Sequence, residues 1–405
     1  MPTVSPRLAW LTVGLLWLAY VINYVDRQVV FSLLPILKNE LHFTDVQLGL
    51  VGSVFLWVYS LSMPITGRLA DLYPRHRLIL ASLALWSVAT FATGMSHSVS
   101  TLLFWRFMMG ITESLYVPAA LSIIAALHTG ATRSRALSIH ASAQFTGIAL
   151  GGWYGGWSAD HIGWRSGFSL LGVIGVAYSA VLFATFRKLP SSLDRSAVRQ
   201  SASPLDILKS RSYIALCVAF FAFALILWML YAWLPNFIYE KYGLSLTDSG
   251  SLATLYLQVG SFIGVLAGGA LADRFVQRVP AARFYLVATG FLLSVPLAWV
   301  MLSVNSLAAV RIASGAFGIF AGLGIANIFA ATYDVIAPRN YGLGAGSLNM
   351  LGGLSGGAGI LAAGMWKASL GVTGLVQISA IVSVILSLAL IAVTAVYFDR
   401  ERSRV

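Results

Sequence analysis

Long apolar segments follow one another along the chain and strongly limit what it can fold into. A helix must be about 20 residues long to cross a bilayer, because each residue adds about 1.5 Å and the hydrocarbon core is about 30 Å thick. The sequence therefore predicts an all-α membrane protein with twelve transmembrane helices. The segments that meet this requirement are residues 8–37, 48–70, 78–95, 100–127, 135–158, 166–186, 212–240, 248–271, 282–303, 305–333, 340–364 and 373–398.

Charged residues are few and unevenly placed. They make up 10% of the 405 residues, and the mean hydropathy is +0.82, whereas a soluble domain has about 25% charged residues. Lys and Arg outnumber Asp and Glu by 26 to 14, and most of the basic residues fall in alternate connecting segments. This positive-inside pattern predicts a multi-pass protein of the cell (inner, cytoplasmic) membrane with both termini in the cytoplasm. Topology thus accounts for the positive charge, and no nucleic-acid partner is expected.

Matching residues recur after roughly 200 positions, which indicates an internal duplication. The stretch at residues 187–211 is rich in Ser, Pro and charge, as linkers are. We therefore predict two parallel six-helix repeats, an N-terminal bundle (1–186) and a C-terminal bundle (212–405), joined by a cytoplasmic linker (187–211). The matching pairs include Arg106 with Arg311, Gly110 with Gly315, Gly67 with Gly269, Asp71 with Asp273 and Gln144 with Asn349.

Acidic side chains stand well inside two of the predicted spans. Placing one at membrane depth costs at least about 2.5 kcal/mol, so such residues usually pair or line a water-filled cavity. Asp26 is predicted to take up and release a proton, and a fixed ion pair with a basic neighbour is the alternative. Glu113 lies two turns after Arg106 on one helix face. It is predicted to accept a proton and exchange partners, or else to form a static pair that closes its helix on the first.

Arg27 directly follows Asp26, so the two side chains project about 100° apart on a helix. Its own face also carries Asn23 and Tyr24. A guanidinium can donate two parallel hydrogen bonds to a carboxylate. We predict that Arg27 anchors an anionic substrate, and a structural counter-ion for Glu113 or Asp26 is the alternative.

Two acids and three arginines are expected to be buried together. Protonating either acid would add to the positive excess, and a substrate carboxylate would offset it. Proton uptake and anion binding should then favour each other, as symport requires. The set consists of Asp26, Glu113, Arg27, Arg106 and Arg311.

Other polar side chains inside the spans are candidates for substrate contacts. Gln144 and Asn349 occupy equivalent positions in the two repeats, and an amide suits a hydroxylated substrate because it both donates and accepts; packing is the alternative. His140 is predicted to be a hydrogen-bonded structural histidine rather than a proton relay. The sequence contains no His and Cys cluster typical of a metal site and no nucleophile or nucleotide-binding motif. No metal, no cofactor and no enzyme activity are therefore predicted.

Two copies of one loop motif indicate a family. GRLADLYPRHR (67–77) resembles the loop between helices 2 and 3 of the major facilitator superfamily, and GGALADRFVQR (268–278) resembles its second copy. The first copy departs from the pattern at Leu72, which replaces a basic residue, and at Pro74, which replaces a glycine. The gating contacts of that loop are therefore expected to differ.

Further motifs resemble a branch of that superfamily. NYVDR (23–27), FLWVYSL (55–61), GITES (110–114) and LNMLGG (348–353) resemble the anion:cation symporters, which include galactonate and hexuronate carriers and a lysosomal sialic acid exporter. INYVDR and GITESLY also resemble the spinster-type lysolipid transporters.

The resemblance implies roles for single residues. Asp26 and Glu113 match the two acids implicated in proton coupling. Tyr59 matches a tyrosine that contacts substrate, and Asn327 is expected to face the same cavity. Ala330 stands where sugar-acid carriers can have a bulky aromatic residue, which implies a wider pocket. Structural or gating roles are implied for Arg106 and for the motif residues Gly67, Asp71, Asp273 and Arg274.

The sequence thus predicts a proton-coupled symporter of a small organic anion, such as a sugar acid or another carboxylate, that works by alternating access. Its expected partners are that anion and the lipid bilayer, its coupling ion is the proton, and it is expected to be a monomer. A spinster-like transporter of lysolipids or other amphiphiles is the first alternative. A receptor or sensor that kept the fold and lost transport is the second.

Overall fold

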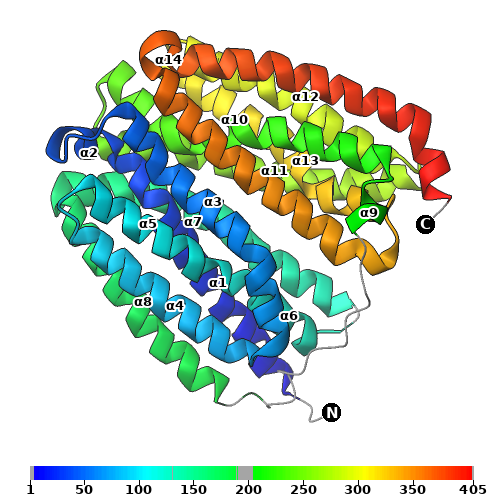
Figure 1. Ribbon diagram of the computed structural model, residues 1–405, viewed down its shortest axis with the longest axis horizontal. Helices are drawn as coiled ribbons and strands as arrows, with labels where there is room; N and C mark the ends of the chain where they lie inside the picture. Colours follow the sequence, from blue (N-terminus) through cyan, green and yellow to red (C-terminus); the bar gives the residue numbers. More distant parts are fainter. Residues whose placement is uncertain (1–3, 130, 188, 190–203, 404–405) are drawn as a thin grey trace. The chain divides into compact units, whose positions relative to one another are not determined.

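The computed structural model describes residues 4–129, 131–187, 189 and 204–403. These residues form helices joined by short connections, and none of them is in a β-strand (Figure 1). Ten helical segments within this part of the chain are long and apolar enough to cross a membrane. The predicted all-α membrane architecture is confirmed at this level.

The chain divides into two compact units. Unit 1 comprises Met1–Val198 with Ile238–Ser251, and unit 2 comprises Arg199–Phe237 with Leu252–Val405. The predicted domain boundaries at residues 186 and 212 stay predictions. Most of the predicted linker lies outside the described residues.

Unit 1 is built on helix pairs. The main neighbours are α1 with α7, α4 with α8, and α3 with α5. Capping boxes begin α3 at Thr44 and α5 at Ser98, because each side chain accepts a hydrogen bond from the third backbone N–H of its helix. The helices are α1 Pro6–Val29, η1 Val30–Leu33, α2 Leu34–Glu40, α3 Asp45–Leu72, α4 Arg75–Gly94, α5 Val99–Ser114, α6 Tyr116–Leu127, α7 Ala131–His161 and α8 Trp164–Phe186.

Unit 2 contains most of α10 and α11 and all of the later helices, and α12 packs on both α13 and α14. Helix α14 is interrupted at Gly371, whose φ of 66° lies in the region that only glycine adopts readily. The helices are α9 Pro204–Ile207, α10 Arg211–Tyr242, α11 Leu246–Val276, α12 Ala282–Ser303, α13 Leu307–Tyr333, η3 Pro338–Asn340 and α14 Tyr341–Arg402.

Glycines allow the closest helix contacts within each unit. A Cβ at Gly147 of α7 would lie 2.5 Å from the Cβ of Tyr24 in α1, and one at Gly151 would lie 2.8 Å from the Cβ of Gln28. In unit 2, Gly356 of α14 packs in the same way against the indole of Trp228. Small residues at such positions are typical of closely packed transmembrane helices.

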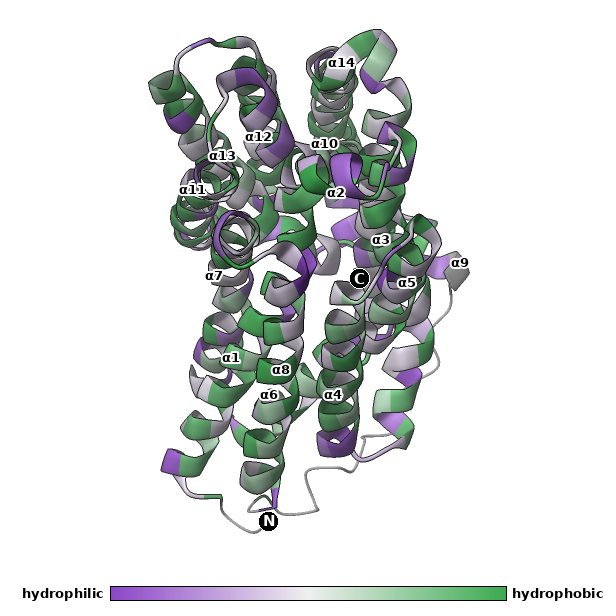
Figure 2. Ribbon diagram, turned by 90° about the vertical axis from the view of Figure 1, so that its left-hand side faces the viewer, coloured by the Kyte–Doolittle hydropathy of each residue, from purple (hydrophilic) through white to green (hydrophobic). Residues whose placement is uncertain are grey.

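The surfaces of the helices are strongly apolar. Figure 2 shows hydrophobic residues along the shafts and several polar residues near helix ends and in connections. Large apolar side chains are exposed there, such as Ile65 at 65%, Leu266 at 61% and Ile312 at 73%. Such exposure suits a lipid environment and would be unfavourable in water.

Candidate functional site

A cluster of four buried charged residues lies inside unit 1, and we call it the charge cluster. It consists of Asp26 and Arg27 on α1 and of Arg106 and Glu113 on α5. Each has an exposed fraction of 4% or less. Ionic groups removed from water in this way are tolerated only with partners, so their contacts indicate what the cluster can do.

Arg27 and Glu113 form the ion pair of the cluster. Nη2 of Arg27 lies 2.9 Å from Oε2 of Glu113 and 3.5 Å from Oδ1 of Asn23. The second carboxylate oxygen of Glu113 and Nε of Arg27 have no hydrogen-bond partner among the described residues. The pair is therefore bridged by one hydrogen bond and keeps unused donor and acceptor capacity.

Three aromatic rings surround the Arg27 guanidinium. Its Cζ lies 4.6 Å from the ring centre of Tyr24, 4.8 Å from that of Phe55 and 4.7 Å from that of Tyr59. Cation–π attraction acts within about 6 Å and holds the cation in position independently of a carboxylate. Tyr59, a predicted substrate contact, is thus brought beside Arg27.

Arg106 is held by other groups. Its Nε donates to the carbonyl oxygen of Val51 at 3.1 Å, Nη1 lies 3.3 Å from Sδ of Met109, and Cζ lies 4.7 Å from the ring centre of Phe55. Phe55 therefore contacts both guanidinium groups of the cluster. Phe55 was not among the residues predicted from the sequence, although its position one helical turn before Tyr59 places both rings on one face of α3.

The Asp26 side chain lies next to α4. Thr90 and Trp86 of that helix lie beside its carboxylate, but no polar atom of the three side chains reaches hydrogen-bond geometry within the described part of the chain. An unpaired buried carboxylate is costly when charged. Asp26 is thus the least compensated member of the charge cluster, and the sequence did not reveal that Trp86 and Thr90 face it.

His140 belongs to an aromatic stack beside the cluster. Oη of Tyr116 donates to the carbonyl oxygen of Leu16 at 2.5 Å and lies 3.3 Å from Nε2 of His140. The imidazole stacks on Tyr20 with 4.7 Å between ring centres. These contacts support the prediction of a hydrogen-bonded structural histidine.

The predicted amide contacts lie in different surroundings. Gln144 is half-buried on α7 in unit 1, and Asn349 is exposed on α14 in unit 2. Asn327 is buried, and its Nδ2 donates to the carbonyl oxygens of Gly268 and Leu323 at 3.1 and 3.0 Å. Its amide therefore fastens α13 to α11, and a part in substrate binding stays a prediction for all three amides.

The residues predicted from the loop motif lie near helix ends. Gly67 and Asp71 are half-buried in the last turns of α3, and Asp273 and Arg274 are exposed near the end of α11. A gating role for these four residues stays a prediction.

Arg311 requires a correction. We expected it to be buried with the other charges, but it is exposed and lies in the second turn of α13, near its N-terminal end. Its Cζ lies 5.8 Å from the ring centre of Tyr256. The residue was misplaced because its sequence match to Arg106 does not fix how deeply a side chain is packed. The buried set therefore contains two acids and two arginines.

Comparisons with known proteins agree with this architecture. The model of the Major Facilitator Superfamily matches residues 16–360 and 216–405. A probable sulfoacetate transporter of Cupriavidus necator is 30% identical over 302 residues, which cover 70% of this chain and 69% of the relative. The D-galactonate transporter of Escherichia coli is 25% identical over 378 residues, which cover 86% of this chain and 87% of the relative.

A solved structure shares the fold over almost the whole length. The crystal structure of a bacterial homologue of the human lysosomal transporter Spinster superposes with a TM-score of 0.82 at 20% identity, covering 99% of this chain and 98% of that chain.

Proposed function

Because the chain belongs to the Major Facilitator Superfamily, we propose that it is a proton-coupled symporter that carries a small organic anion across the cell membrane by alternating access. The substrates named for two relatives, sulfoacetate and D-galactonate, are small organic anions, and both relatives are transporters. A sugar acid or another small carboxylate is the substrate class that these names and the charge cluster support best.

The observation that carries the proposal is the buried ion pair between Arg27 and Glu113, with 2.9 Å between Nη2 and Oε2. A proton on Glu113 would cancel the negative charge that faces Arg27. The guanidinium, still held by Tyr24, Phe55 and Tyr59, could then donate its forked hydrogen bonds to a substrate carboxylate.

With Arg311 excluded, the net charge of the charge cluster favours coupling between proton binding and anion binding. With every member ionised, the two acids and two arginines of the charge cluster are electrically neutral. Protonating Asp26 or Glu113 leaves one uncompensated positive charge in a buried site, which is costly. Binding an anion relieves that cost, and by linkage the bound anion favours protonation to the same extent. Uptake of a proton and of an anion would thus accompany each other.

A twelve-helix arrangement in two six-helix repeats is part of the proposal. Ten apolar segments are described, and the longest, Pro338–Arg402, is interrupted at Gly371 and is long enough for two spans. Helix α7 has 31 residues but falls outside the ten. Counting α14 twice and adding α7 gives twelve, with both termini placed in the cytoplasm by the charge bias.

Flux measurement tests the proposal. Sulfoacetate, D-galactonate and related sugar acids would first be screened for thermal stabilisation of the purified protein. Hits would then be followed in proteoliposomes with and without an imposed inward proton gradient. We expect one anion class to accumulate only with the gradient. Anion uptake that is the same with and without the proton gradient would contradict proton coupling. The absence of any anion flux would contradict a small organic anion as the substrate.

The alternative of a lysolipid carrier rests on the motifs INYVDR and GITESLY. The same screen includes lysophosphatidylcholine. Stabilisation and transport of that lipid in place of the sugar acids would favour the alternative.

A further inference from the structure

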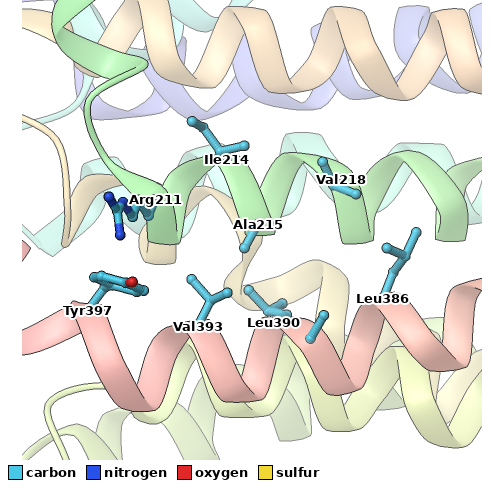
Figure 3. A pocket seen from close by; sticks show the side chains of 9 residues that line it. Arg211, Ile214, Ala215, Val218, Leu386, Leu390, Val393 and Tyr397 are labelled. Carbon is cyan, nitrogen blue, oxygen red and sulfur yellow. The ribbon is translucent and has the colours of Figure 1, made fainter.

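A groove on unit 2, separate from the charge cluster, lies between the first turns of α10 and the last part of α14 (Figure 3). It has a volume of about 250 Å³. Each helix contributes one alanine, Ala215 or Ala389, whose short side chain leaves room. The residues that line the groove are mostly three or four positions apart in the sequence, so they lie on one face of each helix. The lining residues are Arg211, Ile214, Ala215 and Val218 of α10 and Leu386, Ala389, Leu390, Val393 and Tyr397 of α14.

The groove has the length of one bilayer leaflet. From Leu386 to Tyr397 it extends along about 16 Å of α14, at 1.5 Å per residue, and half of the hydrocarbon core measures about 15 Å. Its floor includes Leu390, which is fully buried. Ile214 and Val218 on its wall are 40% and 43% exposed, so the groove opens to the surroundings of the protein. A single acyl chain fits these dimensions and this chemistry.

One end of the groove is polar and cationic. Figure 3 shows Arg211 and Tyr397 together at that end, with Val218 and Leu386 at the other. The Arg211 guanidinium lies 4.6 Å from the ring centre of Tyr397. It is exposed, and no acidic side chain among the described residues forms an ion pair with it.

Glu401, which contacts the backbone of Arg211, binds other groups. Glu401 accepts hydrogen bonds from Oγ of Ser210 and from the backbone N–H groups of Arg211 and Ser212, at 2.9, 2.6 and 3.1 Å. Its charge thus caps the N-terminus of α10. The Arg211 guanidinium remains available to an anion from the membrane interface.

We propose that this groove binds one anionic phospholipid, with its phosphate on Arg211 and one acyl chain along Ile214, Leu390 and Leu386. The cation favours a lipid with net negative charge over a zwitterionic one. The proposed ligand needs both the phosphate and the acyl chain, because a free phosphate would make no contact with the apolar wall of the groove. This site does not depend on the identity of the transported substrate.

Native mass spectrometry of the detergent-purified protein tests the site, with phosphatidylglycerol and phosphatidylcholine of identical acyl chains as probes. We expect one phosphatidylglycerol to be retained by the wild type in preference to phosphatidylcholine. Arg211→Gln should bind phosphatidylglycerol about fivefold more weakly, the effect of one basic residue at a membrane surface. Ala389→Leu should fill the groove and abolish retention of this lipid.

Arg278→Gln is the matched control, because this exposed arginine follows α11 in the same unit and does not line the groove. It should bind phosphatidylglycerol like the wild type. Melting temperatures without lipid show whether each variant is folded, and phosphatidylglycerol should raise that of the wild type more than that of Arg211→Gln.

Three results would overturn the proposal. These are equal retention of the two lipids by the wild type, unchanged retention of phosphatidylglycerol by a folded Arg211→Gln or Ala389→Leu variant, and stabilisation by inorganic phosphate equal to that by the lipid.

Discussion

The two arginines of the charge cluster are held in different ways. Arg106 bonds to a backbone carbonyl and a thioether, and no acidic side chain among the described residues lies within ion-pair distance of it. Arg27 instead depends on Glu113, a partner whose charge a proton can cancel. Arg106 is therefore suited to a fixed structural charge, whereas Arg27 is suited to exchanging one anionic partner for another.

Removing the Arg27 guanidinium should abolish substrate uptake. A hydrogen bond to a charged group contributes about 1.5 to 3 kcal/mol, so we expect Arg27→Ala to lower uptake by at least tenfold. The control is Arg311→Gln, which removes an exposed arginine of α13 outside the charge cluster and should leave uptake close to normal. Initial rates in proteoliposomes measure both. Normal uptake by Arg27→Ala would show that this residue does not anchor the substrate.

Neutralising the acids should separate binding from proton coupling. Glu113→Gln and Asp26→Asn each mimic a permanently protonated acid, so accumulation driven by a proton gradient should be lost. Exchange of labelled for unlabelled substrate needs no net proton movement and should persist in part. Uptake under a gradient and counterflow without one are compared in the same liposomes. A variant that still accumulates substrate would exclude that acid as the coupling site.

Part of this site was predictable from residue types alone. A carboxylate and a guanidinium inside apolar spans must find partners. Two alternative roles were predicted for Arg27 and two for Glu113, and for both residues one of these roles was an ion pair between them. The contact of Phe55 with both arginines and the exposure of Arg311 were not predictable. They depend on the rotation and depth of each helix, which the order of residues in a single span does not fix.

At the scale of helices, close packing within unit 1 depends on glycines. Helix α7 approaches α1 so closely that Tyr24 and Gln28 occupy the space of a Cβ at Gly147 and Gly151. The sequence did not reveal the 3₁₀ segment Val30–Leu33, which follows the charged pair of α1.

Gly147→Val should destabilise the protein, because its Cβ would lie 2.5 Å from that of Tyr24. Overpacking of this kind typically costs about 1 to 3 kcal/mol. Gly14→Ala is the control, since no atom lies within 4 Å of the added carbon, and it should stabilise α1 by up to about 1 kcal/mol. Apparent melting temperatures in detergent report both. A melting temperature of Gly147→Val equal to that of the wild type would contradict the described contact of α7 with α1.

The end of α13 should confer a pH-dependent stability. Asp334 follows that helix and pairs with Arg283 of α12, with 2.7 Å between Oδ1 and Nη1. Burial raises the pKa of Asp334 above its ordinary value, although Arg283 acts to lower it. Arg283→Gln would raise that pKa further. The folded variant would then hold the proton more tightly than the unfolded chain does, so acidification would favour folding.

We therefore expect Arg283→Gln to cost about 1 kcal/mol near pH 7 and progressively less toward pH 5. Melting temperatures of the variant and the wild type at several pH values measure this difference. Arg283→Lys keeps the charge and should show a smaller deficit. A deficit that stays constant with pH would mean that Asp334 is not the group affected.

At the scale of the whole molecule, the two units carry their charges differently. Unit 1 has five buried Asp, Glu or Arg residues within its helices, the four of the charge cluster and Arg75 at the start of α4, whereas Glu401, near the end of α14, is the buried charged residue of unit 2 in the part that the structure describes. The duplication predicted from the sequence did not reveal this asymmetry, because residues matched in sequence, such as Arg106 and Arg311, differ in burial. Proton and anion chemistry are therefore proposed for unit 1.

The orientation of the chain in the membrane is open to a direct test, because Cys217 is the one cysteine in the sequence and is buried in α10. In a Cys217→Ala background, Lys241→Cys should react with an impermeant maleimide in intact cells. Arg278→Cys should react only after permeabilisation, since the positive-inside bias places it in the cytoplasm. If Arg278→Cys reacted in intact cells and Lys241→Cys did not, the topology would be the reverse of the predicted one.

The same experiment determines which leaflet would supply the proposed phospholipid. Helix α10 begins at Arg211, and α11 returns in the opposite direction and ends before Arg278. If both cross the membrane once, Arg211 and Arg278 lie on one side. Protection of Arg278→Cys in intact cells would therefore assign the lipid of the groove to the cytoplasmic leaflet, where anionic lipids and basic residues attract each other.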